Sequence, residues 1–244
     1  MESSKSVIHL YLFVAAIFIL GGCTTKIHFD LPELAPEYSK LEAPIPLRVA
    51  LIVPEKTREF AYKIPLKHWC LGEAVPGHMG NGLRAAFKDV VTVVNGEAPA
   101  DVDRVMICSL GDKTDLKAGV FVWSDKTTII ELNCQVSDNA KSVLWEGYVL
   151  RTDTFNPGIA GYMLPITALA SNFLPKMDVR GAEAMYADTI TSAANNCLIL
   201  AVDQFMEKML REGRSKICPG CNDATDWRKT VSPVKSDTIE NDEN

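Results

Sequence analysis

The chain has 244 residues, of which 47% are hydrophobic and 23% charged, and its formal net charge is −6. This length corresponds to one domain with appendages, or at most two small domains, and the composition is sufficient for an ordinary hydrophobic core. A mildly acidic chain without a block of lysine and arginine lacks the positive surface that binds nucleic acids or anionic lipid headgroups. We therefore expect no nucleic-acid partner, and any attachment to a membrane has to be apolar or covalent.

The first 22 residues have the pattern of a signal peptide. Positions 7–20 form an apolar run that follows Lys5 and contains one polar residue, His9. Such a run is shorter than the roughly 20 residues of a membrane-spanning helix, but it fits the core of a signal peptide. The run ends in Leu20-Gly21-Gly22-Cys23. A plain signal peptide or an uncleaved anchor with a chance cysteine is the alternative, but a cysteine directly after the apolar core and two glycines favours a processing site.

Leu20-Gly21-Gly22-Cys23 resembles the bacterial lipobox. The resemblance implies a thioether-linked diacylglycerol on Cys23, cleavage before that residue and acylation of the new amino terminus. Two or three acyl chains make membrane attachment stable. By the same resemblance, Thr24 rather than an aspartate after the cysteine favours export to the outer membrane, on its periplasmic face.

Residues 23–46 are expected to form a lipidated tether. Thr24–Pro46 has no glycine, and its prolines favour a semi-extended chain; they are Pro32, Pro36, Pro44 and Pro46. The apolar run 47–53 predicts a central strand, and the alternation through Phe60, Tyr62 and Ile64 predicts a half-buried strand.

A helix is predicted next, over residues 77–90. Met79, Leu83, Ala86, Phe87 and Val90 share one helical face in this stretch. Residues 91–94 and 104–110 are further strand candidates.

The middle of the chain predicts a three-strand antiparallel meander over residues 118–123, 127–136 and 142–152. Two short polar segments separate these stretches, and apolar residues alternate with polar ones along the second.

Two helical segments follow, at 158–174 and 182–211, and the second is long and amphipathic. Residues 222–244 contain six acids and three bases, so we expect a disordered acidic tail. The order of elements predicts one α+β domain over residues 47–221, with a mainly antiparallel sheet and helices packed on one face.

The Gly80-x-Gly82-Leu83 helix start after an initial strand is similar to small outer-membrane lipoproteins of the YajG type. The resemblance covers the tether and the first half of the domain. It implies a compact α/β domain and brings no catalytic residues with it.

Six cysteines remain after Cys23, and an even number in an oxidising compartment permits disulfides. Cys108, Cys134 and Cys197 lie on predicted core faces, where a free cysteine behaves as a small hydrophobic residue.

The cysteines of Cys218-Pro219-Gly220-Cys221 have a spacing that allows three interpretations. A structural clip at the end of the last helix is favoured, because redox enzymes place such a pair at the start of a helix after a strand. Thiol–disulfide exchange is the second interpretation. The third is a zinc site that would also need His68 and Cys70.

No known catalytic pattern is present: no histidine sits in a motif with a nucleophile, and the acidic residues are scattered. We therefore expect no enzymatic activity, no cofactor and no metal. The expected function is that of an envelope lipoprotein that acts through a protein partner in assembly, trafficking or structural support. The alternatives are thiol–disulfide exchange and binding of a small apolar or lipid ligand by residues 158–174.

Residues 159–174 form the longest apolar stretch after the signal, which carries no charge and is interrupted by Pro165. The stretch is too short to span a membrane comfortably. A helix buried against the meander is one interpretation. The other is a partly exposed contact surface for a partner, with Ile159, Tyr162 and Leu169 as the candidate residues.

Overall fold

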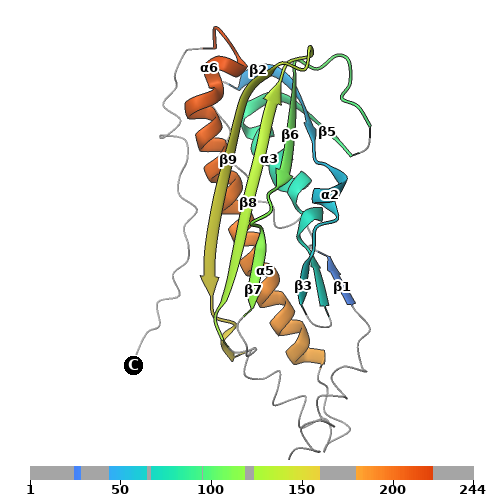
Figure 1. The fold of residues 1–244 in the computed structure, drawn as a ribbon, viewed down its shortest axis with the longest axis vertical. Helices are drawn as coiled ribbons and strands as arrows, with labels where there is room; N and C mark the ends of the chain where they lie inside the picture. Colours follow the sequence, from blue (N-terminus) through green and yellow to red (C-terminus); the bar gives the residue numbers. More distant parts are fainter. Residues whose placement is uncertain are drawn as a thin grey trace, which may run out of the picture.

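The computed structural model describes residues 25–28, 44–64, 67–94, 96–118, 124–159 and 180–221. Within these ranges the chain has an α+β fold with a six-stranded mixed sheet, a smaller three-stranded sheet, and helices behind the large sheet (Figure 1).

The large sheet contains parallel and antiparallel strands in about equal parts. Its strands are β2 (Ile45–Ile52), β5 (Phe87–Val93), β6 (Arg104–Leu110), β7 (Asp115–Ala118), β8 (Lys126–Ser137) and β9 (Val143–Phe155). The order is β5-β2-β6-β8-β7, and β9 pairs with the other edge of β8. β2 is parallel to β5 and β6, whereas β8 is antiparallel to β6, β7 and β9.

The prediction of a mainly antiparallel sheet was therefore wrong. The connection from β2 to β5 contains a helix, which is the kind of crossover that parallel neighbours require. Alternation along a strand indicates which of its faces is buried, but not the direction of the strand beside it.

The predicted meander is present as β7, β8 and β9. Along β8 every second residue is buried, from Lys126 to Val136. Both neighbouring strands run antiparallel to β8, as predicted. β7 begins at Asp115, earlier than expected, and residues 119–123 lie outside the described residues.

A second sheet joins three short strands in the order β1-β4-β3. They are β1 (Thr25–His28), β3 (Tyr62–Ile64) and β4 (Lys67–Cys70). β1 lies in the segment assigned to the tether and pairs in parallel with β4. Two short helices flank this sheet in the chain, α2 (Glu55–Arg58) and the 3₁₀ helix η1 (Leu71–Glu73).

Helix α3 (Val75–Ala86) ends earlier than predicted. Phe87 has extended backbone angles and begins β5, where it pairs with Ile45 of β2. The helical spacing of Phe87 and Val90 is thus overridden by pairing with a strand that is distant in the chain.

The long carboxyl-terminal helix is α5 (Arg180–Lys208), followed by a π-helical turn, η2 (Met209–Gly213), and α6 (Arg214–Ile217). Helices α3 and α5 contact each other and the same face of the large sheet. Their buried side chains form one core with those of the sheet, and fully burying a Leu or Phe side chain contributes about 1.5–3 kcal/mol. Within the described ranges, no helix is long and apolar enough to cross a bilayer.

Candidate functional site

The face of the large sheet that points away from α3 and α5 carries no helix in the described part of the chain. Figure 1 looks onto this face, with α3 and α5 behind the strands. On its parallel half, neighbouring strands place aliphatic side chains side by side. Ile52 pairs with Val93 on one side and Ile107 on the other, and one row away Ala50 lies between Val91 and Val105. We name these side chains the aliphatic patch: Ile52, Val91, Val93, Val105 and Ile107.

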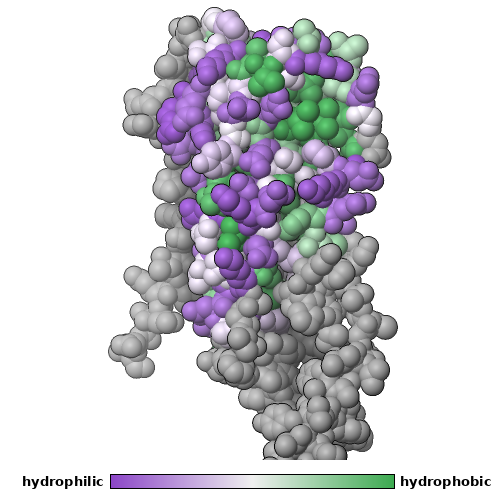
Figure 2. Space-filling view, viewed as in Figure 1, coloured by the Kyte–Doolittle hydropathy of each residue, from purple (hydrophilic) through white to green (hydrophobic). Residues whose placement is uncertain are grey.

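The antiparallel half of the same face is more polar, although it also carries the exposed side chains of Tyr148 and Leu150. β8 directs Glu131, Asn133 and Gln135 to this side, and β9 directs Glu146 to it. Figure 2 shows the division, with a green area over β2, β5 and β6 and mostly purple side chains over β8 and β9. Ile107 keeps 39% of its surface exposed, so the aliphatic patch is accessible to solvent.

A pocket of about 650 Å³ lies beside this patch, at the carboxyl ends of β2 and β5. In sheets with parallel strands, ligands commonly bind at the carboxyl ends of the strands. The pocket is enclosed by α2, by the start of α3 and by the end of β5, and Val93 belongs both to its lining and to the aliphatic patch. The apolar side chains that line the pocket are Val53, Ala61, Pro76, Val93 and Val94.

The walls of the pocket are held by contacts between distant segments. The buried Thr57 of α2 accepts a hydrogen bond, at 3.2 Å, from the backbone N–H of Leu110 at the end of β6. Gly72 of η1 donates its backbone N–H to the carbonyl of Phe60 at 2.9 Å. A Cβ atom at Gly72 would lie 1.9 Å from the backbone oxygen of Thr57, so only glycine allows α2 and η1 to approach this closely.

Of the described residues that line the pocket, four are charged: Glu55, Arg58, Glu59 and Glu73. The three glutamates are exposed at the surface, and Arg58 donates its Nε–H to the backbone oxygen of Val53 at 3.2 Å. The lining thus combines an apolar wall with an excess of carboxylates. The site could not be found from the sequence, since its residues belong to five elements (α2, β4, η1, α3 and β5) and the segments beside them, and no local motif connects them.

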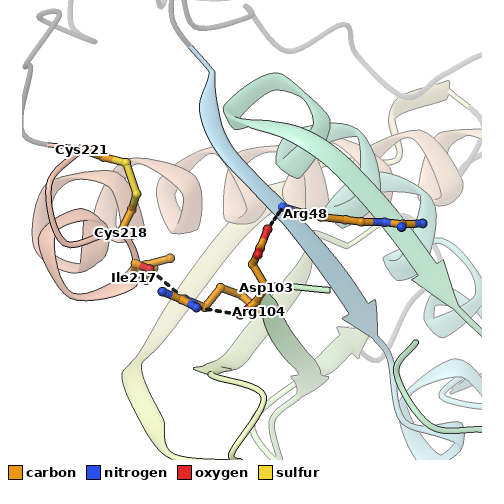
Figure 3. Close-up of a disulfide and its surroundings, with 6 residues drawn as sticks. All are labelled: Arg48, Asp103, Arg104, Ile217, Cys218 and Cys221. Atoms are coloured by element: carbon orange, nitrogen blue, oxygen red, sulfur yellow. Dashed lines mark hydrogen bonds between the residues drawn. A yellow bond between two sulfur atoms is a disulfide. The ribbon is translucent and has the colours of Figure 1, made fainter. Parts of the chain in front are cut away.

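Cys218 and Cys221 are joined by a disulfide at the end of α6 (Figure 3), with their Cα atoms 5.5 Å apart. The backbone N–H of Cys218 donates to the carbonyl of Arg214 at 2.8 Å. Arg104, at the start of β6, donates its Nε–H to the carbonyl of Ile217 at 2.8 Å. The bridge therefore closes the carboxyl end of a helix that is bound to the sheet, which is the geometry of a structural clip.

The four other described cysteines are buried thiols: Cys70, Cys108, Cys134 and Cys197. Cys108 lies directly opposite Cys134, and burial together with this contact raises the pKa of the Cys134 thiol. Burial raises the pKa of Cys197 to about 12. The prediction that Cys108, Cys134 and Cys197 are buried thiols is confirmed. The raised pKa values of Cys134 and Cys197 make these two thiols poor nucleophiles.

His78 is fully buried between α3 and α5, and sequence analysis assigned it no role. Its Nε2 lies 2.9 Å from Oδ1 of Asn195, and its Nδ1 has no hydrogen-bond partner. Burial lowers the pKa of His78 below its usual 6.5, although the hydrogen bond to Asn195 opposes part of this shift. The neutral imidazole is thus the form that fits this position.

No group of three His, Cys, Asp or Glu side chains among the described residues is arranged to hold a metal ion. The zinc interpretation required the thiols of Cys218 and Cys221 together with His68 and Cys70, but those two sulfur atoms are bonded to each other.

Two of the candidate contact residues, Tyr162 and Leu169, lie outside the described residues, as does Cys23. Ile159 is described and keeps 74% of its surface exposed.

No protein-family model and no curated protein matches the chain. Solved structures match it at low similarity. A provisionally described lipoprotein from Caulobacter crescentus is 8% identical, with a TM-score of 0.39, over 67% of this chain and 88% of that chain. A minor lipoprotein from Acinetobacter baumannii is 10% identical, with a TM-score of 0.37, over 68% of this chain and 92% of that chain.

The lipoprotein GNA1162 from Neisseria meningitidis is 12% identical, with a TM-score of 0.29, over 53% of this chain and 99% of that chain. Since these TM-scores are below 0.5, the likenesses decide neither the family nor the function of this chain.

Proposed function

We propose that this protein is a bacterial envelope lipoprotein, held to the periplasmic face of the outer membrane by lipid on Cys23. The observation that carries the proposal is Leu20-Gly21-Gly22-Cys23 at the end of the apolar run 7–20. A net charge of −6 gives little attraction to anionic headgroups, so lipid rather than a basic surface supplies the attachment.

Mass spectrometry of the mature protein tests the anchor. The expected amino terminus is Cys23 carrying diacylglycerol and an amide-linked acyl chain. Cys23→Ser leaves the protein unprocessed or in the soluble fraction. Normal size and normal membrane fractionation of Cys23→Ser would contradict the anchor.

We further propose that the domain is non-catalytic and acts by binding a protein of the cell envelope, in assembly, trafficking or structural support. Two exposed apolar features support a binding role: the aliphatic patch and the side chain of Ile159. Contiguous apolar surface of this kind marks interaction sites more often than isolated exposed residues do.

Crosslinking in native membranes tests the partner, and single charge substitutions identify the surface. Ile159→Asp changes an exposed side chain at the start of the apolar stretch 159–174. Ile107→Asp changes an exposed side chain of the aliphatic patch. The substitution that lies in the contact surface is expected to abolish crosslinking to the partner. Circular dichroism of that variant should show an unchanged fold. If both variants keep the partner, neither region is the contact.

Thiol–disulfide exchange is the second candidate function, because Cys218 and Cys221 are bonded across a two-residue spacer. Reactive pairs of this spacing are typically held at the positive amino-terminal end of a helix, which stabilises a thiolate. This pair lies at the carbonyl end of α6 instead, and Cys218 is buried. Catalytic reduction of a test disulfide by the purified protein, lost in Cys218→Ser, would establish the redox function.

A further inference from the structure

We propose that the pocket at the carboxyl ends of β2 and β5 binds a small organic cation, an amine or guanidine carried on an apolar body. The proposal is independent of the lipid on Cys23 and of the protein partner, so its failure would leave both of those unchanged.

The charged side chains of the lining determine which sign of charge a ligand can carry. Among the described side chains of the lining, Glu55 and Glu59 place two exposed carboxylates at the pocket, Glu73 lies in the same lining, and Arg58 supplies one guanidinium. Arg58 directs its Nε–H to the backbone oxygen of Val53. The amino-terminal end of α3 adds only about half a positive charge. Among the described side chains, carboxylates therefore outnumber cationic groups, and this charge attracts a cation and repels an anion.

The apolar part of the lining selects the body of the ligand. Val53 follows Ile52, the partner of Val93, so it lies beside the end of β5, and Ala61, Pro76 and Val94 add further apolar lining. A bare metal or ammonium ion would gain nothing from these side chains. An aliphatic or aromatic body gains about 25 cal/mol for each Å² of apolar surface that it buries there.

The volume and the fixed walls fit a small molecule. About 650 Å³ lies within the roughly 300–1,000 Å³ of pockets that bind small ligands. It corresponds to about 20 water molecules at about 30 Å³ each. The hydrogen bond from Leu110 to Thr57 and the close approach at Gly72 hold α2 and η1 in place. A pocket that is formed in advance loses less entropy when its ligand binds.

Three probes with one cyclohexyl body separate the contributions of charge and apolar contact. They are cyclohexylmethylammonium, cyclohexylmethanol and cyclohexanecarboxylate. Binding of each to the full-length protein, in micelles of an uncharged detergent, is measured by ligand-observed NMR, with empty micelles as the blank. The expected result is binding of the ammonium, weaker binding of the alcohol and no binding of the carboxylate. Added salt is expected to weaken the binding of the ammonium probe and to leave the binding of the alcohol unchanged.

The paired variant Glu55→Gln/Glu59→Gln removes two exposed carboxylates while keeping their shape. Because an exposed charge pair contributes modestly, affinity for the ammonium is expected to fall roughly 2- to 30-fold, with the alcohol unchanged. Glu146→Gln, on the polar half of the open face, is the matched control and should bind like the unchanged protein. Three results would overturn the proposal. The carboxylate or the alcohol could bind as tightly as the ammonium, none of the three probes could bind, or the paired variant could bind the ammonium with unchanged affinity.

Discussion

Lys208 and Tyr148 make two contacts across the edge of β9 that pairs with no strand in the described ranges. The Lys208 ammonium donates to the backbone oxygen of Tyr148 at 3.1 Å and lies 4.9 Å from the centre of its ring. Lys208 comes from α5 on the covered face, whereas the Tyr148 side chain, 60% exposed, belongs to the open face. The lysine therefore passes around the edge strand and places a charge beside it, a common protection of sheet edges against pairing with another chain.

Lys208→Ala is expected to expose the long edge of β9 and to promote concentration-dependent self-association. Loss of the contact between the ammonium and the ring also costs about 0.5–1 kcal/mol of stability. Sedimentation velocity over a range of protein concentrations measures the association. Lys216→Ala, an exposed lysine of α6, is the control and should sediment like the unchanged protein. Identical sedimentation of Lys208→Ala would show that this lysine does not protect the edge.

Gly213→Ala is expected to destabilise the domain, even though alanine favours a helix by about 1 kcal/mol over glycine. Gly213 lies in the π-helical turn η2, and a Cβ there would lie 2.9 Å from Cγ of the buried Trp145. Forcing apart such a contact costs about 1–3 kcal/mol, so the net loss should be about 1 kcal/mol. Chemical denaturation measures it, with the exposed Ser215→Ala of α6 as the control. A stabilised Gly213→Ala would mean that η2 relaxes freely away from Trp145.

Acid is expected to weaken the contact between α3 and α5 through His78. Burial lowers the pKa of folded His78, so below about pH 6.5 the unfolded chain binds a proton more readily than the folded protein does. This contribution to stability is present above pH 6.5 and is lost as the pH falls from 6.5 towards the folded pKa.

Unfolding free energies measured at a series of pH values test this prediction. His78→Gln removes the titrating group and can still bond to Asn195, so its stability should depend less on pH over this range. The same pH dependence in the variant and in the unchanged protein would assign the acid sensitivity to other groups.

The double variant Cys218→Ser/Cys221→Ser is expected to lose at most about 2 kcal/mol of stability, because so short a closed loop constrains the unfolded chain little. Membrane fractionation should be unchanged. Arg104 still holds the carbonyl of Ile217 when the bridge is absent. Under reducing conditions, the unchanged protein should have the same free energy of unfolding as the variant. A loss of stability well above about 2 kcal/mol would show that the bridge has a larger structural role.

Local periodicity was enough to predict the elements whose partners are close in the chain. The alternation of Ile130, Leu132, Cys134 and Val136 depends only on the two-residue repeat of a strand, and β8 buries these side chains as expected. β8 and β9 are joined by a short turn, so their antiparallel pairing also followed from the spacing. The length of α5 followed in the same way from its helical repeat.

The candidate pocket could not be predicted in this way. Val53, Pro76 and Val94 come together only because β2 pairs in parallel with β5 after a long connection that contains α2, β3, β4, η1 and α3. His78 and Asn195 are 117 positions apart, and nothing near either residue indicates the other.

The sequence by itself determined the α+β class, the meander, the buried cysteines and, through Leu20-Gly21-Gly22-Cys23, the expectation of a lipid anchor. Only the tertiary structure decided the direction of β2, β5 and β6, the end of α3 at Ala86, and the pocket beside the aliphatic patch. The physical reason is the range of the interactions. Burial patterns follow the short repeats of strands and helices, whereas strand pairing and pocket walls depend on contacts between segments that are far apart in the chain.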